Sequence, residues 1–233
     1  MTFIAPVERP RIDAGRIEAL PGFDDGAFWV QDAASAWMTD LVPAEARTVL
    51  DACAAPGGKT AQLLPTCRRV VAADLSPLRL RRVSELSQRL GRTIQTIAED
   101  ARHPAGAGAS FDRVLVDVPC SGTGVLRRHP EARWRKQAVD LPRQAQRQYE
   151  ILVAAFARLR PGGVLVYSTC SLEEEENDAV VDRFLAAHPE ARLEPASALF
   201  PDQPWARRTV QRLPGRDDGD GAYAARIRRE PSA

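Results

Sequence analysis

The sequence has few cysteines and histidines, and their spacing does not match a metal site. Four cysteines, at positions 53, 67, 120 and 170, are separated by 14, 53 and 50 positions, and the three histidines form no H-x-x-x-H pair. Neither a C-x-x-C zinc knuckle nor a dense disulfide framework fits these spacings. We therefore expect no bound metal and reduced thiols, each of them either a small core residue or a nucleophile.

Long apolar runs and an excess of one charge are also missing. No stretch approaches the roughly 18 apolar residues of a membrane span, and Glu8 and Arg9 interrupt the start, where a signal peptide would be apolar. Lysine plus arginine (32) nearly balances aspartate plus glutamate (31), so the net charge does not indicate binding to nucleic acid. With 44% hydrophobic residues, the chain is neither disordered nor collagenous. We expect a cytoplasmic protein without a membrane segment.

Short apolar runs alternate with amphipathic stretches from Thr48 onward, which is typical of repeated β-α units on a parallel sheet. The predicted strands are residues 48–52, 69–73, 93–97, 111–116 and 164–168. The predicted helices are residues 77–90, 142–159 and 177–188, the second ending at a turn over residues 160–163. The pattern indicates a doubly wound, mostly parallel α/β sheet.

The two ends of the chain have a different composition. Prolines and glycines punctuate residues 1–45, with a short helix predicted at 31–41, so we expect an arm packed on a domain of residues 46–233. A turn cluster at residues 215–221 precedes alternating apolar residues at 223–227. This arrangement predicts a C-terminal antiparallel hairpin.

The loop after the first predicted strand has the composition of a ligand-binding loop. It reads Cys53-Ala54-Ala55-Pro56-Gly57-Gly58-Lys59, and such small residues let a ligand approach the backbone and the free amides of a helix start. The G-x-G-x-x-G spacing of dinucleotide loops is missing, and a P-loop would need glycine at position 53. The alternative interpretation is a tight strand-to-helix turn.

Polar or reactive side chains follow the other strands. Asp74, Asp100, Asp117 and Cys170 stand at four strand ends, and the carboxyl edge of an open parallel sheet is where ligands bind. A carboxylate at Asp74 can accept hydrogen bonds from a ribose diol. One such residue would more often be a cap or an ion pair, but four together favour a site.

Two cysteine motifs follow neighbouring predicted strands. One is Asp117-Val118-Pro119-Cys120-Ser121-Gly122-Thr123-Gly124, and the other is Tyr167-Ser168-Thr169-Cys170-Ser171. Either thiol alone is compatible with a buried core cysteine. If the two strands are adjacent, both thiols reach the same rim, and the pair then favours a catalytic site.

These motifs resemble the signature motifs of the Nop/Sun (RsmB-like) family of S-adenosylmethionine-dependent RNA cytosine-5 methyltransferases. Supporting matches are Val30-Gln31-Asp32, Arg128-His129-Pro130 with Trp134, and Asp218-Gly219-Asp220-Gly221. The resemblance covers nearly the whole chain from about Pro21. It implies a Rossmann-like methyltransferase sheet, S-adenosylmethionine as cofactor and RNA as substrate, with ribosomal RNA favoured.

The resemblance also implies a role for each site residue. Cys170 is the expected nucleophile, Cys120 assists release of the product, and Asp117 lies between the cofactor and the target base. The residues implied to line the cofactor are Cys53, Ala54, Ala55, Pro56, Gly57, Gly58, Lys59, Asp74, Asp100 and Asp117. Chemistry alone leaves open which thiol attacks, and Lys59 has an alternative role as a helix-start cation near Asp51.

Three other functions are compatible with the sequence. The substrate is tRNA in one alternative. In a second, an amino-group methyltransferase uses residues 117–120 as a clamp, which leaves Cys170 unexplained. In a third, the chain is a non-catalytic RNA-binding or assembly factor that retains the fold. About 45 residues precede the first strand, and many relatives carry an RNA-binding domain there, so a separate RNA-binding domain or protein is an expected partner.

Three basic clusters are candidates for phosphate contact. The best placed follows Cys120, and Trp134 beside it has a ring that can stack on a base. The first cluster stands on a predicted helix, where a solvated face is the simpler interpretation. The clusters are Arg79, Arg81 and Arg82; Arg127, Arg128, Arg133, Arg135 and Lys136; and Arg207, Arg208 and Arg212.

Overall fold

The computed structural model describes residues 16–106, 108–134, 137–217 and 219–231. They form an eight-stranded sheet in the order β3-β2-β1-β4-β5-β8-β6, with β7 paired to β8. The strands are β1 Thr48–Asp51, β2 Arg69–Asp74, β3 Gln95–Ala98, β4 Phe111–Asp117, β5 Leu159–Thr169, β6 Ala191–Glu194, β7 Val210–Arg212 and β8 Ala222–Arg229. Strands β1 to β5 pair in parallel, whereas β8 runs antiparallel to β5, β6 and β7. The predicted mostly parallel sheet with a C-terminal antiparallel hairpin is confirmed.

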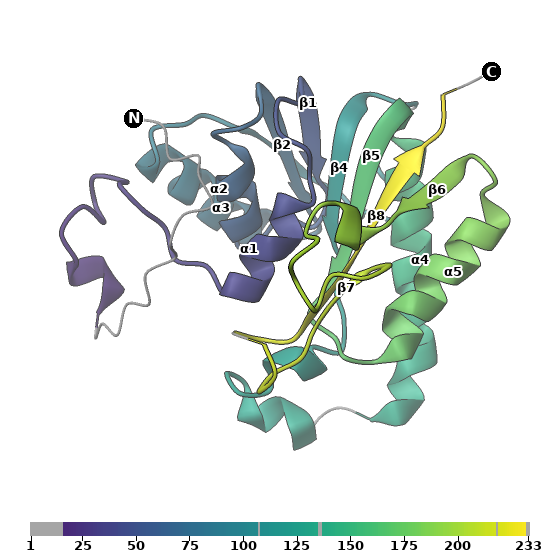
Figure 1. Cartoon of the computed structure of the whole chain (residues 1–233). Helices are drawn as coiled ribbons and strands as arrows, with labels where there is room; N and C mark the ends of the chain where they lie inside the picture. Colours follow the sequence, from purple (N-terminus) through teal and green to yellow (C-terminus); the bar gives the residue numbers. More distant parts are fainter. Residues whose placement is uncertain (1–15, 107, 135–136, 218, 232–233) are drawn as a thin grey trace.

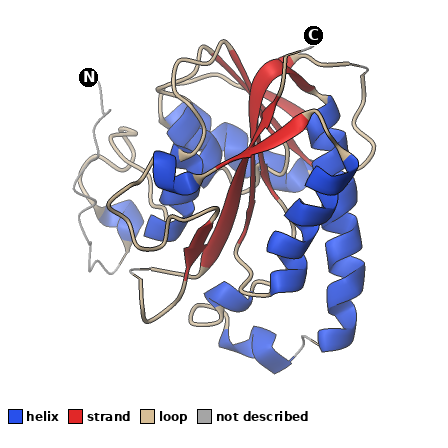
Figure 2. Cartoon of the chain, turned by 45° about the vertical axis from the view of Figure 1, so that its right-hand side comes forward, coloured by secondary structure: helices blue, strands red, loops and turns tan. Residues whose placement is uncertain are grey.

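Helices cover both faces of the sheet (Figures 1 and 2). On one side lie α1 (Ala33–Asp40), α2 (Gly58–Leu63) and α3 (Pro77–Arg89), and on the other lie α4 (Leu141–Ala157) and α5 (Asp178–Ala187). Helix α3 begins as its sequence predicts, because Ser76 accepts a hydrogen bond from the Arg79 amide and Pro77 occupies the first turn.

The two core layers follow from the alternation of side chains along the central strands. Leu115 and Val166 pack with Met38 of α1, whereas Val116 and Tyr167 pack with Phe156 and its neighbours on α4 and α5. Residues 114–116 of β4 and 164–167 of β5 are thus buried on both faces, and their sequences are continuous apolar runs. This burial fixes the position of the loops that follow both strands.

Strand β6 and the start of β5 differ from the sequence prediction. Strand β6 was not predicted, because its side chains are only partly apolar; Glu194 accepts bonds from Arg226 (2.6 Å) and Arg228 (2.5 Å) of β8, which the sequence does not reveal. Strand β5 begins at Leu159, before the predicted turn. Its pairing with β4 then jumps from Leu159 to Val164, so residues 160–163 leave the ladder as the turn residues that the sequence indicates.

The segment before β1 contacts the domain along its described part. Arg89 of α3 donates to the carbonyls of Phe23 (2.5 Å) and Phe28 (2.9 Å), and α1 contributes to the core. Residues 1–15 of the expected arm lie outside the described residues, and a boundary at position 45 stays a prediction. Among the helices that the structure describes, none has the length and apolar character that crossing a membrane requires.

Candidate active site at the carboxyl edge of the sheet

Asp117, at the end of β4, is held by two neighbours on the carboxyl edge. Lys59 Nζ on α2 donates to Asp117 Oδ2 at 2.8 Å, and Ser168 Oγ of β5 donates to Asp117 Oδ1 at 2.8 Å. Burial alone would lower the pKa of Lys59, but the adjacent Asp117 raises it, so the ammonium stays charged. Lys59 therefore bonds to Asp117 rather than serving only as a cation beside Asp51.

The two cysteines of the predicted motifs lie together next to this ion pair. The Sγ atoms of Cys120 and Cys170 are 3.3 Å apart, and both thiols are free and partly buried. The hydrogen bond between them lowers the pKa of Cys170, assisted by Lys59 and opposed by burial, and it raises the pKa of Cys120 well above the usual thiol value. Of the two thiols, Cys170 is therefore the one that ionises more readily.

The loop between β1 and α2 has the geometry of a ligand-binding turn. Gly57 has a left-handed φ of 110°, and a Cβ there would lie 3.2 Å from the Cα of Val83, so the tight turn requires glycine. Asp74 at the end of β2 accepts bonds from the amides of Ala55 (3.1 Å) and Ser76 (3.0 Å). The Asp74 carboxylate therefore lies beside the loop and also holds its backbone in place through Ala55.

Three carboxylates surround this loop. Burial raises the pKa of Cys53 first, and the charges of Asp51, Asp117 and Asp74 raise it further. Burial also raises the pKa of Asp51 to about 7, although Thr60 Oγ1 donates to it at 2.7 Å. A negative potential of this kind suits a cationic ligand.

Asp100 follows β3 at the same edge and belongs to a separate ion pair. The Arg102 guanidinium donates to both of its oxygens, the shortest contact being 2.7 Å, and these bonds lower the pKa of Asp100 to about 2. Within the described residues, Asp100 forms no hydrogen bond or ion pair with the thiols or with the β1–α2 loop. Its place among the residues that line the cofactor stays a prediction.

Glu176, which the motifs did not indicate, is a fully buried carboxylate (0% exposed) behind the two cysteine loops. It accepts bonds from the Ser121 amide (2.8 Å), the Ser121 hydroxyl and Gln148 Nε2 (2.8 Å). Glu176 ends a run of four glutamates at residues 173–176, and such a run usually indicates a solvated surface. The only signal was its position a few residues after Cys170.

The supporting motifs also meet in space. Arg128 bonds to Asp32 Oδ2 (2.5 Å) and Asp220 Oδ2 (2.6 Å), and Arg127 bonds to Asp220 Oδ1 (3.1 Å). These two arginines therefore brace the connection that follows Cys120, which lies below the sheet in Figure 1. Asp218, another part of these motifs, lies outside the described residues.

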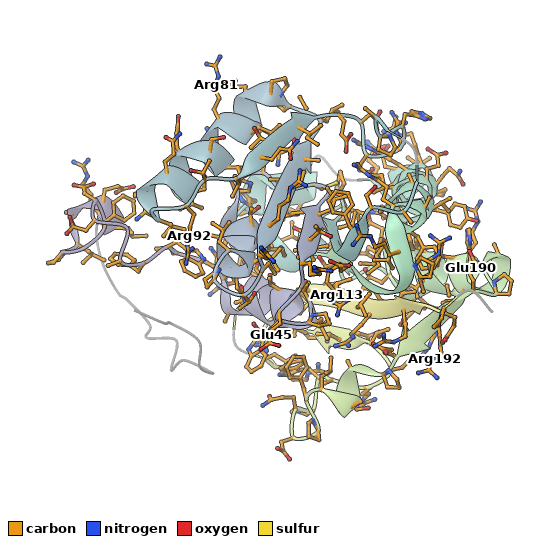
Figure 3. The ribbon with its side chains drawn as sticks, turned by 90° about the horizontal axis from the view of Figure 1, so that it is seen from above. Glu45, Arg81, Arg92, Arg113, Glu190 and Arg192 are labelled. Atoms are coloured by element: carbon orange, nitrogen blue, oxygen red, sulfur yellow. The ribbon has the colours of Figure 1, made fainter. Side chains whose placement is uncertain are left out.

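Some of the remaining basic residues are exposed to solvent, and others bond to groups of the protein. Trp134 is 78% exposed, with the Arg133 guanidinium 4.7 Å from its ring centre, whereas Arg135 and Lys136 lie outside the described residues. On α3, Arg79 donates to the Ala55 carbonyl at 2.7 Å, and Arg81 points away from the domain (Figure 3). Trp134 and Arg133 therefore remain as exposed candidates for RNA contact.

Comparisons with known proteins agree with the motifs. The sequence profile of "16S rRNA methyltransferase RsmB/F" matches residues 38–228. Ribosomal RNA small subunit methyltransferase B is 45% identical over 214 residues in Vibrio vulnificus and 43% identical over 216 residues in Shigella sonnei. These alignments cover 90% and 91% of this chain and 49% of each relative, so the chain spans about half the length of the curated relatives it matches.

Solved structures show the same relationship. The crystal structure of NSun6 from Pyrococcus horikoshii with SFG has a TM-score of 0.78 and 29% identity, covering 94% of this chain and 57% of that one. A methyltransferase homologue from the same organism has a TM-score of 0.76 and 28% identity, covering 92% and 72%. The Rossmann-like methyltransferase fold and the resemblance noted in the motifs are both confirmed, and the chain belongs to the RsmB/F family of 16S rRNA methyltransferases.

Proposed function

We propose that the chain is the catalytic domain of an RNA (cytosine-5)-methyltransferase that methylates a cytidine of ribosomal RNA with S-adenosylmethionine. The observation that carries this proposal is the pair of free sulfurs 3.3 Å apart beside the Lys59–Asp117 ion pair. Carbon 5 of cytosine is a poor nucleophile, and a thiolate that adds to carbon 6 activates it. Family membership supports RNA as the substrate, and the names of the relatives favour ribosomal RNA.

The residues of the β1–α2 loop fit the methyl donor. When bound, S-adenosylmethionine supplies an electrophilic methyl group on a positively charged sulfonium. The carboxylates around the loop favour a cation, and Asp74 has the lone pairs to accept hydrogen bonds from a ribose diol. We assign the binding of the donor to the loop from Cys53 to Lys59 together with Asp74, Asp100 and Asp117.

Cys170 is the proposed nucleophile, because its lowered pKa favours the thiolate. Its sulfur forms a bond to carbon 6 of an unstacked cytosine, and the electron pair of the C5=C6 bond moves to carbon 5, which takes the methyl group. Asp117, held by Lys59 and Ser168, hydrogen-bonds the polar edge of the base and stabilises the charge that develops during attack.

Cys120 is the proposed release group. After methylation, water accepts the proton from carbon 5, and the electron pair of that C–H bond restores the C5=C6 bond. The bond between carbon 6 and the sulfur of Cys170 breaks at the same time, and its electron pair leaves on the sulfur. Cys120 lies 3.3 Å from the sulfur that must leave. It can therefore assist the departure of the Cys170 thiolate.

A methyl-transfer assay with labelled S-adenosylmethionine tests this function. The purified chain is incubated with small-subunit ribosomal RNA or with tRNA, alongside Cys170→Ala and the control Cys67→Ala, whose thiol lies outside the site. We expect labelled 5-methylcytidine in ribosomal RNA, no label with C170A and full label with C67A. Label in tRNA instead would reassign the substrate, and full activity of C170A would refute the nucleophile.

RNA capture and cellular location extend the proposal. Since the matched relatives are about twice as long as this chain, we propose that a further RNA-binding domain or protein presents the RNA. The cytoplasm is the proposed compartment, because two adjacent thiols stay reduced there. If the chain bound RNA but showed no calorimetric binding of S-adenosylmethionine at millimolar concentration, a non-catalytic assembly role would replace the enzymatic one.

A further inference from the structure

Glu176 gathers three hydrogen-bond donors on one carboxylate without any exposure to solvent. Its Oε1 accepts from the Ser121 amide and from Gln148 Nε2, both at 2.8 Å, and its Oε2 accepts from the Ser121 hydroxyl. A buried carboxylate is costly unless its oxygens are satisfied. Here the site satisfies them with donors from two other elements, the Cys120 loop and helix α4.

The bonds of Glu176 lead directly to the two cysteines. Ser121 follows Cys120, Ser171 follows Cys170, and the Oγ atoms of the two serines are 3.0 Å apart. Glu176 is itself fixed to β5, because the Tyr167 hydroxyl donates to its main-chain carbonyl at 2.6 Å. A continuous chain of hydrogen bonds thus ties the loop that carries Cys120 to β5, the strand that Cys170 follows.

Gln148 of α4 also holds the Cys120 loop. The same Nε2 that donates to Glu176 also donates to the carbonyl of Pro119 at 3.0 Å. The residues on both sides of Cys120 are therefore anchored through one buried carboxylate and one buried amide. Cys120 stands in the sequence between these two anchored residues, Pro119 and Ser121.

We propose that Glu176 is a positioning residue, whose buried carboxylate fixes Ser121 and thereby holds the sulfur of Cys120 against that of Cys170. The effect on the thiol pair stands independently of catalysis, whereas the effect on product release rests on the proposed function. A carboxylate serves here because three donors converge on two oxygens. Glutamine at this position keeps the volume but offers one acceptor oxygen and turns an N–H₂ group toward a donor.

Thiol alkylation tests the geometry without RNA or methyl donor. Iodoacetamide labels the protein at pH 5 to 10, and peptide mapping reports the rate at Cys170 separately from the other cysteines. We expect the Cys170 profile of Glu176→Gln and of Ser121→Ala to shift to higher pH, with the rate at pH 7 falling roughly tenfold in E176Q because a charge-assisted bond is weakened. Glu175→Gln, the same change at the preceding, exposed residue, should keep the parent profile.

Turnover assays then test the consequence for release. With RNA and S-adenosylmethionine, E176Q should accumulate a covalent protein–RNA band relative to the parent, whereas a variant that is only less stable loses band and product together. Parent-like alkylation in both E176Q and S121A, or an equal shift in E175Q, would overturn the positioning role. If no variant or parent methylates RNA while the alkylation shift is present, the proposed function fails and the positioning role survives.

Discussion

The bond between the two thiols makes a quantitative prediction for Cys120→Ala. The Cys120 sulfur lies 3.3 Å from Cys170 and is the first cause of the lowered pKa of Cys170. A hydrogen bond to a charged group contributes about 1.5–3 kcal/mol, and one pKa unit corresponds to about 1.4 kcal/mol. Removing the donor should therefore raise the pKa of Cys170 by about one to two units.

The pH dependence of Cys170 alkylation measures this shift, and Cys120→Ser is the matched control. Serine retains a hydroxyl donor at nearly the same place, so C120S should alkylate at Cys170 with a pH profile close to that of the parent. Lys59 also lowers the pKa of Cys170 and is present in all three proteins. Identical profiles for C120A and the parent would show that the sulfur–sulfur bond does not stabilise the Cys170 thiolate, and would refute the reasoning.

Three further predictions follow from the same structure. With RNA and S-adenosylmethionine, C120A should accumulate a covalent protein–RNA band on a denaturing gel; no band would refute the release role. Gly124→Ala should lower the free energy of unfolding by about 2 kcal/mol, because its Cβ would lie 2.6 Å and 2.7 Å from the carbonyl oxygens of Gly221 and Cys170; an unchanged denaturation midpoint would contradict this. The pKa of Asp51 is about 7 in the folded protein, compared with the usual 3.8. Between these two values only the folded state keeps the proton, so the free energy of unfolding falls as the pH rises through 7. From pH 5 to 8 the parent should lose about 3 kcal/mol more than Asp51→Asn, and parallel denaturation curves for the two proteins would refute it.

The sequence predicted the strands that are buried on both faces and missed the one that depends on ion pairs. Strand β4, predicted at residues 111–116, is Phe111–Asp117, because residues 114–116 are an apolar run of the kind needed where helices cover both faces of a strand. Strand β6 pairs only with β8 and is held by Glu194 and two arginines of that strand. A residue pairing of this kind exists only after the chain has folded.

For the candidate site, the sequence predicted where the two cysteines lie but not how their loops are held. The two motifs follow neighbouring strands, so both cysteines are expected at the same edge of the sheet. Because Asp117 of β4 pairs with Ser168 of β5, the two strands end at the same height. Cys120 then follows three residues after Asp117 and Cys170 two residues after Ser168, and the loop conformations decide whether the sulfurs meet. Those conformations depend on Glu176, whose burial within a run of glutamates has no local sequence signal.

The opposite proton affinities of the two thiols follow from what lies on each side of the pair. The pKa of Cys120 is raised first by its bond to Cys170 and by burial, and then by the charges of Glu176 and Asp117. Cys170 instead has Lys59 among the groups that lower its pKa. The carboxylate that anchors Ser121 therefore also disfavours a thiolate at Cys120, so the contact that fixes the geometry of the pair also favours ionisation of Cys170, the proposed nucleophile, over that of Cys120, the proposed release group.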